Sequence, residues 1–533
     1  MTGLASTGPL TRLALRRDWF MMLAWVLVTT AGVAGVAYWL GQLYPTAAKR
    51  DVLASAAGTN PALVFLYSKL YGDSIGALTA WRYGVWAAIF AALMSIFVVI
   101  RNTRADEEAG RLELVGSAAV GRHAPLTAAL AVAVAGNALL AMLVTAGLVL
   151  AGQPAGGSAA LALAAAAAGV AFGCVAALAA QMAAGARTAR GIALGALGAA
   201  YLLRAVADTA STAPLTWLTW LSPLGWTEQV RPFAGQRWWA LALPAAVAAA
   251  LGAAAYLAAA RRDHGAGLLP DRPGRAQASA LLRGVFGLAW RLELTGLAGW
   301  IAGFLFMGAI FGAAGKGIGS VLGSSSLLRN EFTRIGGQTA ITNAYLAAVV
   351  MLTGLIAAAY ATSVALRLRT EETTGLAEPV LATAAGRLRW ALSRVTIAVT
   401  GTAVLLTGAG LAIGLGYGLR AGNAGGAVTA MLGAALAQLP AALAVAGVAV
   451  LLFGVLPRAC VGIGWAAVAA TLLMKVFGEL LRIPQWAMDI SPFTHVPRLP
   501  GGAVSAAPEV WLSLAAVTLA AVGLGALRLR DIG

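Results

Sequence analysis

Seven carboxylates, gathered in two matching stretches, are the side chains of this chain best suited to chemistry. Residues 104–122 read RADEEAGRLELVGSAAVGR and residues 369–387 read RTEETTGLAEPVLATAAGR, and the two align without a gap. The whole chain of 533 residues has only 20 acidic residues. Those in the stretches are Asp106, Glu107, Glu108, Glu113, Glu371, Glu372 and Glu378. Because carboxylates form strong hydrogen bonds with arginine, the duplication predicts two docking surfaces for a basic partner.

A glycine occupies the same position in each stretch, Gly110 in the first and Gly375 in the second. Glycine permits a sharp change of chain direction, so we expect a turn there, with Glu113 or Glu378 opening a second short segment. The simpler interpretation is a solvated loop whose acids balance nearby arginines. It accounts for one loop, but not for the recurrence of the same positions in the other half.

No other set of side chains forms a recognisable catalytic or metal site. The chain lacks a P-loop of the form G-x-x-x-x-G-K-[ST], and it offers no Ser/His/Asp or Cys/His set with a shared site. Cys174 and Cys460 lie in apolar segments, where cysteine is usually a small buried residue. We therefore expect no enzyme activity, metal or cofactor on this chain.

The composition predicts an all-α integral membrane protein. Hydrophobic residues make up 60% and charged residues 11%, whereas soluble domains carry about 25% charged residues. The net charge of +17 first suggests nucleic-acid binding. However, the basic residues flank apolar runs instead of forming one patch, which is typical of membrane helices.

Twelve membrane spans can be drawn, six in each half. They are 20–43, 83–100, 125–151, 158–184, 190–207 and 238–260, then 290–314, 341–365, 391–417, 426–453, 459–476 and 509–527. We expect two six-helix halves, 1–265 and 286–533, joined by a cytoplasmic linker at 266–285. An even number of spans gives both halves the same orientation, related by a pseudo-two-fold axis along the membrane normal. Residues 12–19 predict a short helix on the membrane surface before the first span.

Arginine placement predicts the orientation. Arginines at 12–17, 101–122, 187–190 and 387–394 flank one set of span ends, whereas the connector 152–158 on the other side has none. The positive-inside rule then places both termini and both acidic loops in the cytoplasm. A signal peptide is the competing interpretation of the N-terminus, but its apolar run is longer than a signal core.

Ionisable residues inside the spans would indicate ion coupling. The span interiors offer mostly Asn137, Gln181 and Gln438 and no central carboxylate. We expect four charged residues near the outer ends of the fifth and eleventh spans to be interfacial, either paired or snorkelling: Arg204, Asp208, Lys475 and Glu479. The energy source is therefore expected on another chain.

Two segments on the outer side, 208–237 and 477–508, are rich in Trp and Pro. They share a Trp followed by Ser-Pro, and the candidate gate residues are Trp217, Ser222, Pro223, Trp486, Ser491 and Pro492. Tryptophan also favours the membrane interface, so surface-lying or re-entrant helices remain the structural alternative to an outer gate.

The pattern [DE]-E-x-x-G-x-x-E-x-V of the two loops, with the Ser-Pro elements, resembles ABC-2-type exporter permeases. The fused twelve-helix arrangement is similar to permeases of actinobacterial polyketide-antibiotic (tetronasin-type) and multidrug exporters. The resemblance covers nearly the whole chain through its two halves. The second loop departs from the first by having Thr373 where the first has Glu108.

The resemblance implies a permease of the bacterial plasma membrane that exports hydrophobic or amphiphilic compounds. Two copies of a separate ATP-binding subunit, which holds ATP and Mg, would dock on the two loops. A cavity between the halves would carry the cargo, with wall candidates Phe90, Met94, Phe97, Tyr201, Tyr360 and Met474. For each of these, core packing or a lipid-facing position is the alternative.

Two other classes of function remain open at this stage. A self-sufficient, ion-coupled secondary transporter with two six-helix repeats would need no partner chain. A membrane-embedded transferase for lipid or sugar would need a carboxylate pair with a metal in an outer loop, for which Asp51 and Asp73 are the distant candidates.

Overall fold

In the part of the chain that the structure, a computed structural model, describes, every regular element is a helix. Described are residues 3–58, 61–116, 119–209, 213–263, 265–269, 277, 284–323, 337–477, 484–502 and 505–530. Within these ranges, eleven helices are long and apolar enough to cross a membrane, which confirms the all-α membrane class. The helix predicted at 459–476 is present as α19 (Cys460–Phe477), whose apolar part, Cys460–Lys475, is shorter than the other eleven.

The chain divides into two compact units, residues 1–274 and 275–533. Much of the linker predicted at 266–285 lies outside the described residues, namely 270–276 and 278–283. Each unit is described by itself below.

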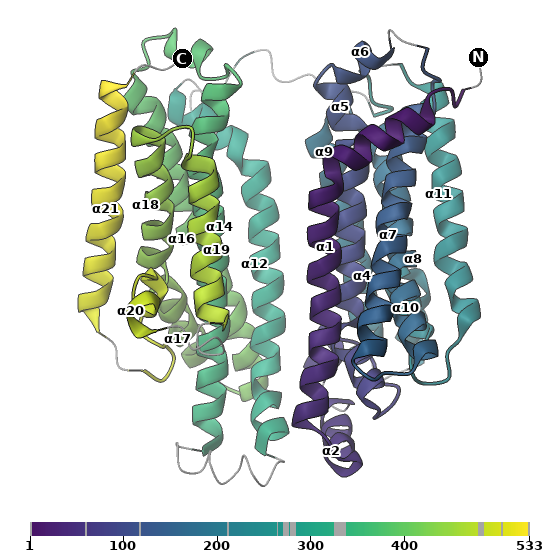
Figure 1. Ribbon diagram of the computed structural model, residues 1–533. Helices are drawn as coiled ribbons and strands as arrows, with labels where there is room; N and C mark the ends of the chain where they lie inside the picture. The colour runs from purple at the N-terminus through teal and green to yellow at the C-terminus, as the bar shows by residue number, and fades with distance from the viewer. Residues whose placement is uncertain are drawn as a thin grey trace. The chain divides into compact units, whose positions relative to one another are not determined.

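The first unit contains six long helices and several short ones (Figure 1). The long helices are α1 (Thr7–Leu43), α4 (Ile75–Arg101), α7 (Ala124–Leu150), α8 (Ala155–Met182), α9 (Ala186–Thr209) and α11 (Ala242–Arg261). The short ones are α2 (Ala47–Gly58), α3 (Pro61–Leu66), α5 (Arg104–Glu108), α6 (Arg111–Gly116), η1 (Ala213–Leu221), α10 (Pro223–Gln229) and η2 (Trp238–Leu241).

Helices α4 and α8 form the centre of the first unit. α4 packs against α1, α8 and α9, and α8 also packs against α7 and α11. Small side chains allow this close approach, since α8 is made largely of alanine and glycine. A buried hydrogen bond from Asn137 Nδ2 to Ser95 Oγ, 2.7 Å long, joins α7 to α4.

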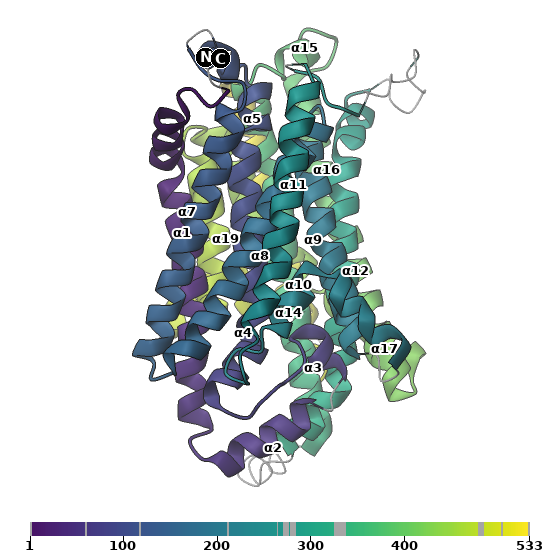
Figure 2. The ribbon, with the colours of Figure 1, turned by 90° about the vertical axis from the view of Figure 1, so that its right-hand side faces the viewer.

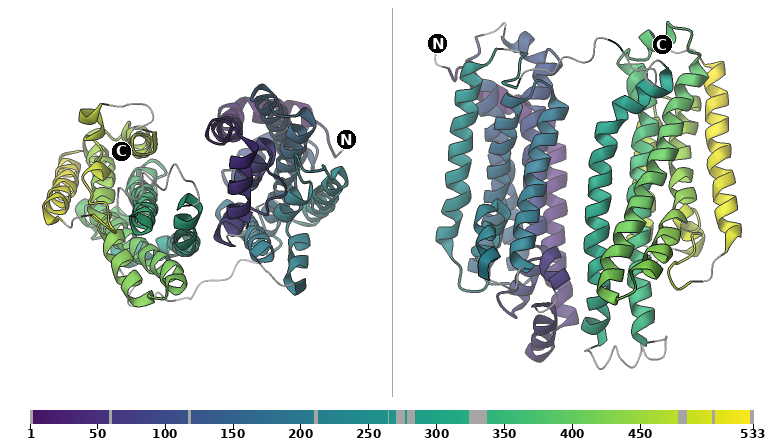
Figure 3. Two further views of the ribbon diagram at one scale, coloured as in Figure 1. Left: turned by 90° about the horizontal axis from the view of Figure 1, so that it is seen from below. Right: turned by 180° about the vertical axis from the view of Figure 1, so that it is seen from behind.

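The second unit also consists mainly of long helices, with short helices and turns between them at other positions than in the first unit. Its helices are α12 (Val285–Gly323), α14 (Gly337–Thr373), α15 (Glu378–Leu381), α16 (Arg387–Ala421), α17 (Ala424–Leu436), α18 (Leu439–Val455), α19, α20 (Gln485–Met488), η4 (Pro492–Thr494) and α21 (Ala506–Leu529). α21 stands at the edge of this unit (yellow in Figure 3) and packs against α18.

A row of glycines four residues apart allows α16 to lie against α17. A Cβ at Gly410, Gly414 or Gly418 would lie 2.5–2.7 Å from backbone atoms of α17. This is the small-xxx-small pattern by which membrane helices approach closely. Gly454 and Gly523 serve the same purpose where α18 crosses α21.

Two predicted segments differ in detail from the structure. Residues 12–19 are helical, as expected, but they are continuous with α1, which begins at Thr7. The span expected at 426–453 is present as one membrane-length segment, Ala424–Val455, in which a turn at Ala437–Gln438 separates α17 from α18. The break precedes Pro440, whose missing N–H and ring disfavour an uninterrupted helix.

Each unit has two ends that differ in their short elements. In the first unit, α5, α6 and the N-terminus lie at one end, and α2 and α10 lie toward the other (Figure 1). In the second unit, α15 lies at the same end as the C-terminus (Figure 2). We call the end with α5–α6, or with α15, the loop end of its unit and the opposite one the far end.

Candidate functional site

The two acidic stretches turn at their glycines, as predicted. Gly110 has φ +70° between α5 and α6, and Gly375 has φ +72° between α14 and α15. In both, the glycine N–H donates to the carbonyl of the residue three positions earlier, Glu107 or Glu372. A positive φ is favourable mainly for glycine, so these two turns depend on that residue type.

The first loop is fixed by an Arg–Glu–Arg triad of Arg104, Glu107 and Arg262. Arg104 Nη1 lies 3.0 Å from Glu107 Oε2, and the Arg262 guanidinium donates two bonds of 2.6 Å to the same carboxylate. Arg262 directly follows α11, so the triad joins the loop to the end of the last helix of the unit. Bidentate pairs of this kind are the strongest of the common ion pairs.

The second loop has an equivalent triad of Arg369, Glu372 and Arg530. Arg369 Nη1 lies 3.0 Å from Glu372 Oε2, and Arg530 Nη2 lies 2.5 Å from Glu372 Oε1. Arg530 directly follows α21, the last helix of its unit. The duplication thus extends to the pairing between the loop and the final helix.

The neighbouring acids, Asp106 and Glu371, have different partners in the two units. Asp106 accepts from Arg17 of α1 at 2.9 Å and from Arg111 of α6 at 2.7 Å. Glu371 accepts from Trp390 Nε1 at 2.9 Å and pairs with Arg394, and both of these lie on α16.

Four of the seven carboxylates in the two loops are largely buried. The side chains of Asp106, Glu107 and Glu372 are 12%, 8% and 4% exposed, and that of Glu371 is 16% exposed. The reason is that arginines of the same unit occupy them, as ion pairing in a partly buried site requires.

Three acids of the two loops remain exposed: Glu108, Glu113 and Glu378. Glu108 accepts the backbone N–H of Ala186 at 3.0 Å and so holds the start of α9. Glu113 and Glu378 make no ion pair within the described residues, and each stands in the first turn of its short helix. They are the matched acidic positions that are free to meet another molecule.

Thr373, which replaces Glu108, makes no corresponding link. Its hydroxyl donates to the carbonyl of Arg369 at 2.9 Å, inside α14. The first loop is therefore joined to one more helix than the second.

A third pair of buried carboxylates was missed from the sequence. Asp18 of α1 is fully buried, lies 3.1 Å from Arg101 Nε and accepts from Asn102 Nδ2 at 2.6 Å. Glu293 of α12 is also buried and lies 2.6 Å from Arg367 Nη1. The two acids share the 275-residue offset that relates Trp25 to Trp300, and that offset could have identified them.

Five of the six predicted wall residues pack inside their own unit. Phe90 and Phe97 contact Trp25 of α1, with ring centroids 6.0 and 6.3 Å apart. Met94 is buried between α4 and α7. These contacts favour core packing over a position on a cargo path.

The two tyrosines among these candidates are also buried. Tyr201 donates to the carbonyl of Leu66 at 3.1 Å, and Tyr360 packs edge-on against Trp300 at 5.7 Å. Met474, the sixth candidate, is half-buried on α19. None of the six lines the cavities beside Glu228, Cys174, Trp300 or Pro500.

The second unit instead contains an apolar cavity of about 220 Å³ between α12 and α14. Its walls include Trp300, Phe304, Met307, Phe311 and Ile356. Aromatic and methionine side chains of this kind suit hydrophobic ligands of varied shape.

The Ser-Pro elements are helix starts. Ser222 is the N-cap of α10 and accepts from Gly225 N–H at 3.2 Å, and Pro223 is the first residue of that helix. Ser491 is likewise the N-cap residue of η4 and Pro492 its first residue, but the Ser491 hydroxyl makes no capping hydrogen bond. Serine at the N-cap followed by proline is a common way to begin a helix, so local folding accounts for the motif.

The two candidate gate tryptophans of these segments are exposed, whereas Ser222 and Ser491 are buried. Trp217 is 55% exposed on η1 and Trp486 is 71% exposed on α20. Exposed tryptophan at the end of a membrane bundle fits interfacial anchoring.

Arg204 and Asp208 are paired, as expected, and lie near the end of α9. Both are buried inside the first unit, where Arg204 Nη1 lies 3.6 Å from Asp208 Oδ2 and 3.2 Å from Glu228 Oε1. Lys475 is half-buried on α19, and Glu479 lies outside the described residues. In the described ranges no three His, Cys, Asp or Glu side chains gather into a metal site.

Comparison with known proteins agrees with the membrane architecture. A family model described as "Multidrug efflux system permease Rv1217c, C-terminal domain" matches residues 282–528. The multidrug efflux system permease protein Rv1217c of Mycobacterium tuberculosis (strain ATCC 25618 / H37Rv) is 40% identical over 532 residues. That alignment covers 100% of this chain and 96% of the relative.

Proposed function

This chain belongs to the family of multidrug efflux system permeases, and we propose that it is the membrane subunit of an ATP-driven exporter. It moves hydrophobic or amphiphilic compounds, of the antibiotic and multidrug type, out of the cytoplasm. A separate ABC-type ATPase, in two copies that hold ATP and Mg, docks on the two loops. The observation that carries the proposal is the duplicated loop, which in both units is joined by a buried triad to the last helix.

The buried and the exposed acids have separate tasks in this proposal. Glu113 and Glu378 are exposed and make the charged contact with arginines of the ATPase. Glu107 and Glu372 lie behind them and transmit a displacement of the loop to the segments that follow α11 and α21. A rigid ion-paired connection of this kind is what mechanical coupling requires.

The loop ends face the cytoplasm of a bacterial cell, with the membrane subunit in the plasma membrane. Support comes from the arginines at the loop ends, among them Arg17, Arg101, Arg111 and Arg387. The positive-inside rule assigns such ends to the cytoplasmic side, together with the two termini.

The test replaces the two exposed acids together, in the double variant Glu113→Lys and Glu378→Lys. Hydrogen bonds to charged groups contribute about 1.5–3 kcal/mol each. We therefore expect ATPase that co-purifies with the chain, and ATP-dependent dye uptake into inverted membrane vesicles, to fall about tenfold or more. Asp51→Lys is the matched control, because Asp51 is an exposed carboxylate on α2 at the far end. Full ATPase retention by the double variant would refute docking at these positions.

A self-sufficient secondary transporter is the second candidate, because the first unit buries the ionisable group Arg204–Asp208–Glu228. Buried charges in membrane helices are typical of ion-coupled transport. The two functions differ in energy source. Uptake into vesicles that needs ATP and persists with a protonophore supports the exporter, whereas uptake that follows an imposed proton gradient without ATP supports the alternative.

A further inference from the structure

The far end of the first unit holds two buried acids beside one arginine. Asp208 lies on α9 and Glu228 on α10, and they are only 6% and 7% exposed. Arg204 Nη1 lies 3.2 Å from Glu228 Oε1 and 3.6 Å from Asp208 Oδ2. Arg204 also donates to the carbonyl of Phe65 at 2.9 Å. One guanidinium therefore joins α9, α10 and the segment that ends α3.

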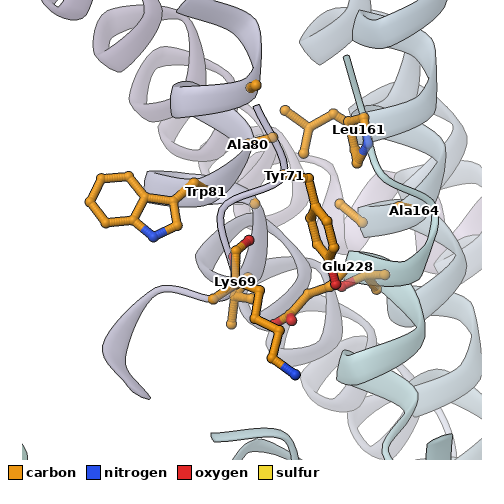
Figure 4. Close-up of a pocket in the computed structure, with 14 residues that line it drawn as sticks. Lys69, Tyr71, Ala80, Trp81, Leu161, Ala164 and Glu228 are labelled. Carbon is orange, nitrogen blue, oxygen red and sulfur yellow. The ribbon is translucent and has the colours of Figure 1, made fainter. Parts of the chain in front are cut away.

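Glu228 borders a small cavity, which Figure 4 shows together with Lys69 and Tyr71. The cavity measures about 30 Å³, which is the room that one water molecule needs. Leu161 and Ala164 of α8 form an apolar wall. The site is too small for a drug-sized cargo, so its natural occupants are water and protons.

The two acids have unused acceptor atoms. Glu228 Oε2 and Asp208 Oδ2 are buried and accept no hydrogen bond. An oxygen of each carboxyl group lies close to the same atom, Arg204 Nη1, at 3.6 Å for Asp208 and 3.2 Å for Glu228. Two carboxylates held so close repel each other when both are ionised, which favours a state in which one of them carries a proton.

Every charged or titratable group around the pair can be named. From α9 come Arg204 and Tyr201, whose ring lies 4.6 Å from the guanidinium carbon. Lys69 Nζ lies 3.6 Å from Asp208 Oδ1 and is partly exposed. Beyond them, Arg231 stacks on Tyr71 and Arg82 of α4 stacks on Tyr67. α8 contributes only apolar side chains to the cavity.

We propose that Asp208 and Glu228 form a proton-binding site of the first unit, and that the bound proton holds α10 against α9. The second unit does not repeat Glu228, since the offset that relates Ser222 to Ser491 places Pro497 at the equivalent position. The site is thus distinct from the duplicated loops and does not depend on the ATPase.

The expected pH dependence follows from the surroundings of Glu228. Burial, and then the charge of Asp208, raise the pKa of Glu228 well above its usual value, and Arg204 opposes them. Burial and the same two acids also raise the pKa of Tyr71 to about 12. A carboxyl with a raised pKa stabilises its contact fully at low pH and loses that contribution as the pH rises through its folded pKa. Docking of α10 should therefore weaken on the alkaline side.

The experiment uses the full chain in nanodiscs, without the ATPase. Infrared difference spectra on raising the pH should show loss of a protonated carboxyl band. The protection factors of residues 223–229, which are corrected for the intrinsic pH dependence of hydrogen exchange, should fall with the same midpoint. Glu228→Gln should lack that band and have protection factors independent of pH. Asp208→Asn removes the neighbouring negative charge, so it should move the midpoint to lower pH.

Asp73→Asn is the matched control, because Asp73 is an exposed carboxylate near the same cavity segment. It should leave the band and the midpoint unchanged. The proposal fails if Glu228→Gln retains the wild-type band, or if Asp208→Asn leaves the midpoint in place when Glu228→Gln does not fold. Since no ATPase is present, failure here is separate from failure of the exporter function.

Discussion

Phe233 shows how single residues shape the far end of the first unit. This residue follows α10 and has φ +62°, an unusual backbone conformation for a residue other than glycine. Its ring lies between two helices that each place a glycine there. A Cβ on Gly76 of α4 would lie 2.4 Å from Phe233 Cδ1, and one on Gly157 of α8 would lie 2.1 Å from it. The ring fits only because both side chains are absent.

Gly157→Ala should therefore displace Phe233 and destabilise the first unit. Overpacking of a well-packed core costs about 1–3 kcal/mol, so we expect a lower thermal unfolding midpoint in detergent. Gly156→Ala is the control, because its Cβ would meet nothing closer than Gln236 Nε2 at 4.0 Å. Equal midpoints for the two variants would show that Phe233 does not occupy this position.

The sequence predicted the acidic residues of the two loops but not their distant partners. The motif located Glu107 and Glu372 and their neighbours, but it could not name Arg262 as a partner because the two residues are 155 positions apart. Asp18 and Glu293 lie within or beside apolar runs without a local motif. Pairing that depends on the packing of distant helices leaves no mark in the local sequence.

At the scale of elements, the triads connect each loop to the end of a long helix. In the second unit, Arg530 also lies over the ring of Phe453, 4.9 Å from its centroid, on α18. The last turn of α21 is thus held by an ion pair and an aromatic contact, although α21 stands at the edge of its unit.

Glu372→Gln should loosen that turn while keeping the shape of the side chain. A charge-assisted hydrogen bond is roughly twice as strong as a neutral one, and about 1.4 kcal/mol corresponds to a factor of ten. We expect hydrogen exchange of residues 524–529 to accelerate about tenfold. Glu378→Gln, at an exposed acid without an ion pair, should leave it unchanged. Similar exchange in the two variants would contradict the structural role of the triad.

Most long helices could be predicted because apolar runs of membrane length are strong signals. The exceptions have local causes. α1 extends to Thr7 through a segment rich in arginine, where hydropathy falls but the helix continues. The span predicted at 426–453 is present but turns just before Pro440, and the apolar part of α19 is shorter than the other spans.

At the scale of the whole molecule, the two units share an architecture but connect their loops differently. The first loop is bonded to α1 through Arg17, to α9 through Glu108 and to the end of α11 through Arg262. The second is bonded to α16 through Glu371 and to the end of α21 through Arg530. Thr373 stands where the first loop has Glu108, and the second loop therefore lacks the link that Glu108 makes to the start of α9.

This asymmetry predicts that the two loops contribute unequally to transport. Glu113→Lys and Glu378→Lys, made singly, should weaken ATPase binding to a similar extent, because both acids are exposed in the first turn of a short helix. Transport per ATP hydrolysed should fall further in Glu113→Lys, since the first loop moves three helices and the second moves two. Dye uptake into vesicles, divided by phosphate release, measures this ratio.

Glu108→Ala provides the internal check on that prediction. It removes only the bond to the Ala186 N–H, 3.0 Å long, and leaves the exposed Glu113 in place. ATPase binding should therefore be retained. Transport per ATP should decrease, because the first loop then has links to two helices, the same number as the second loop. Equal transport in the two single lysine variants, together with wild-type transport in Glu108→Ala, would mean that the additional link to α9 is structural and that the loops act as equals.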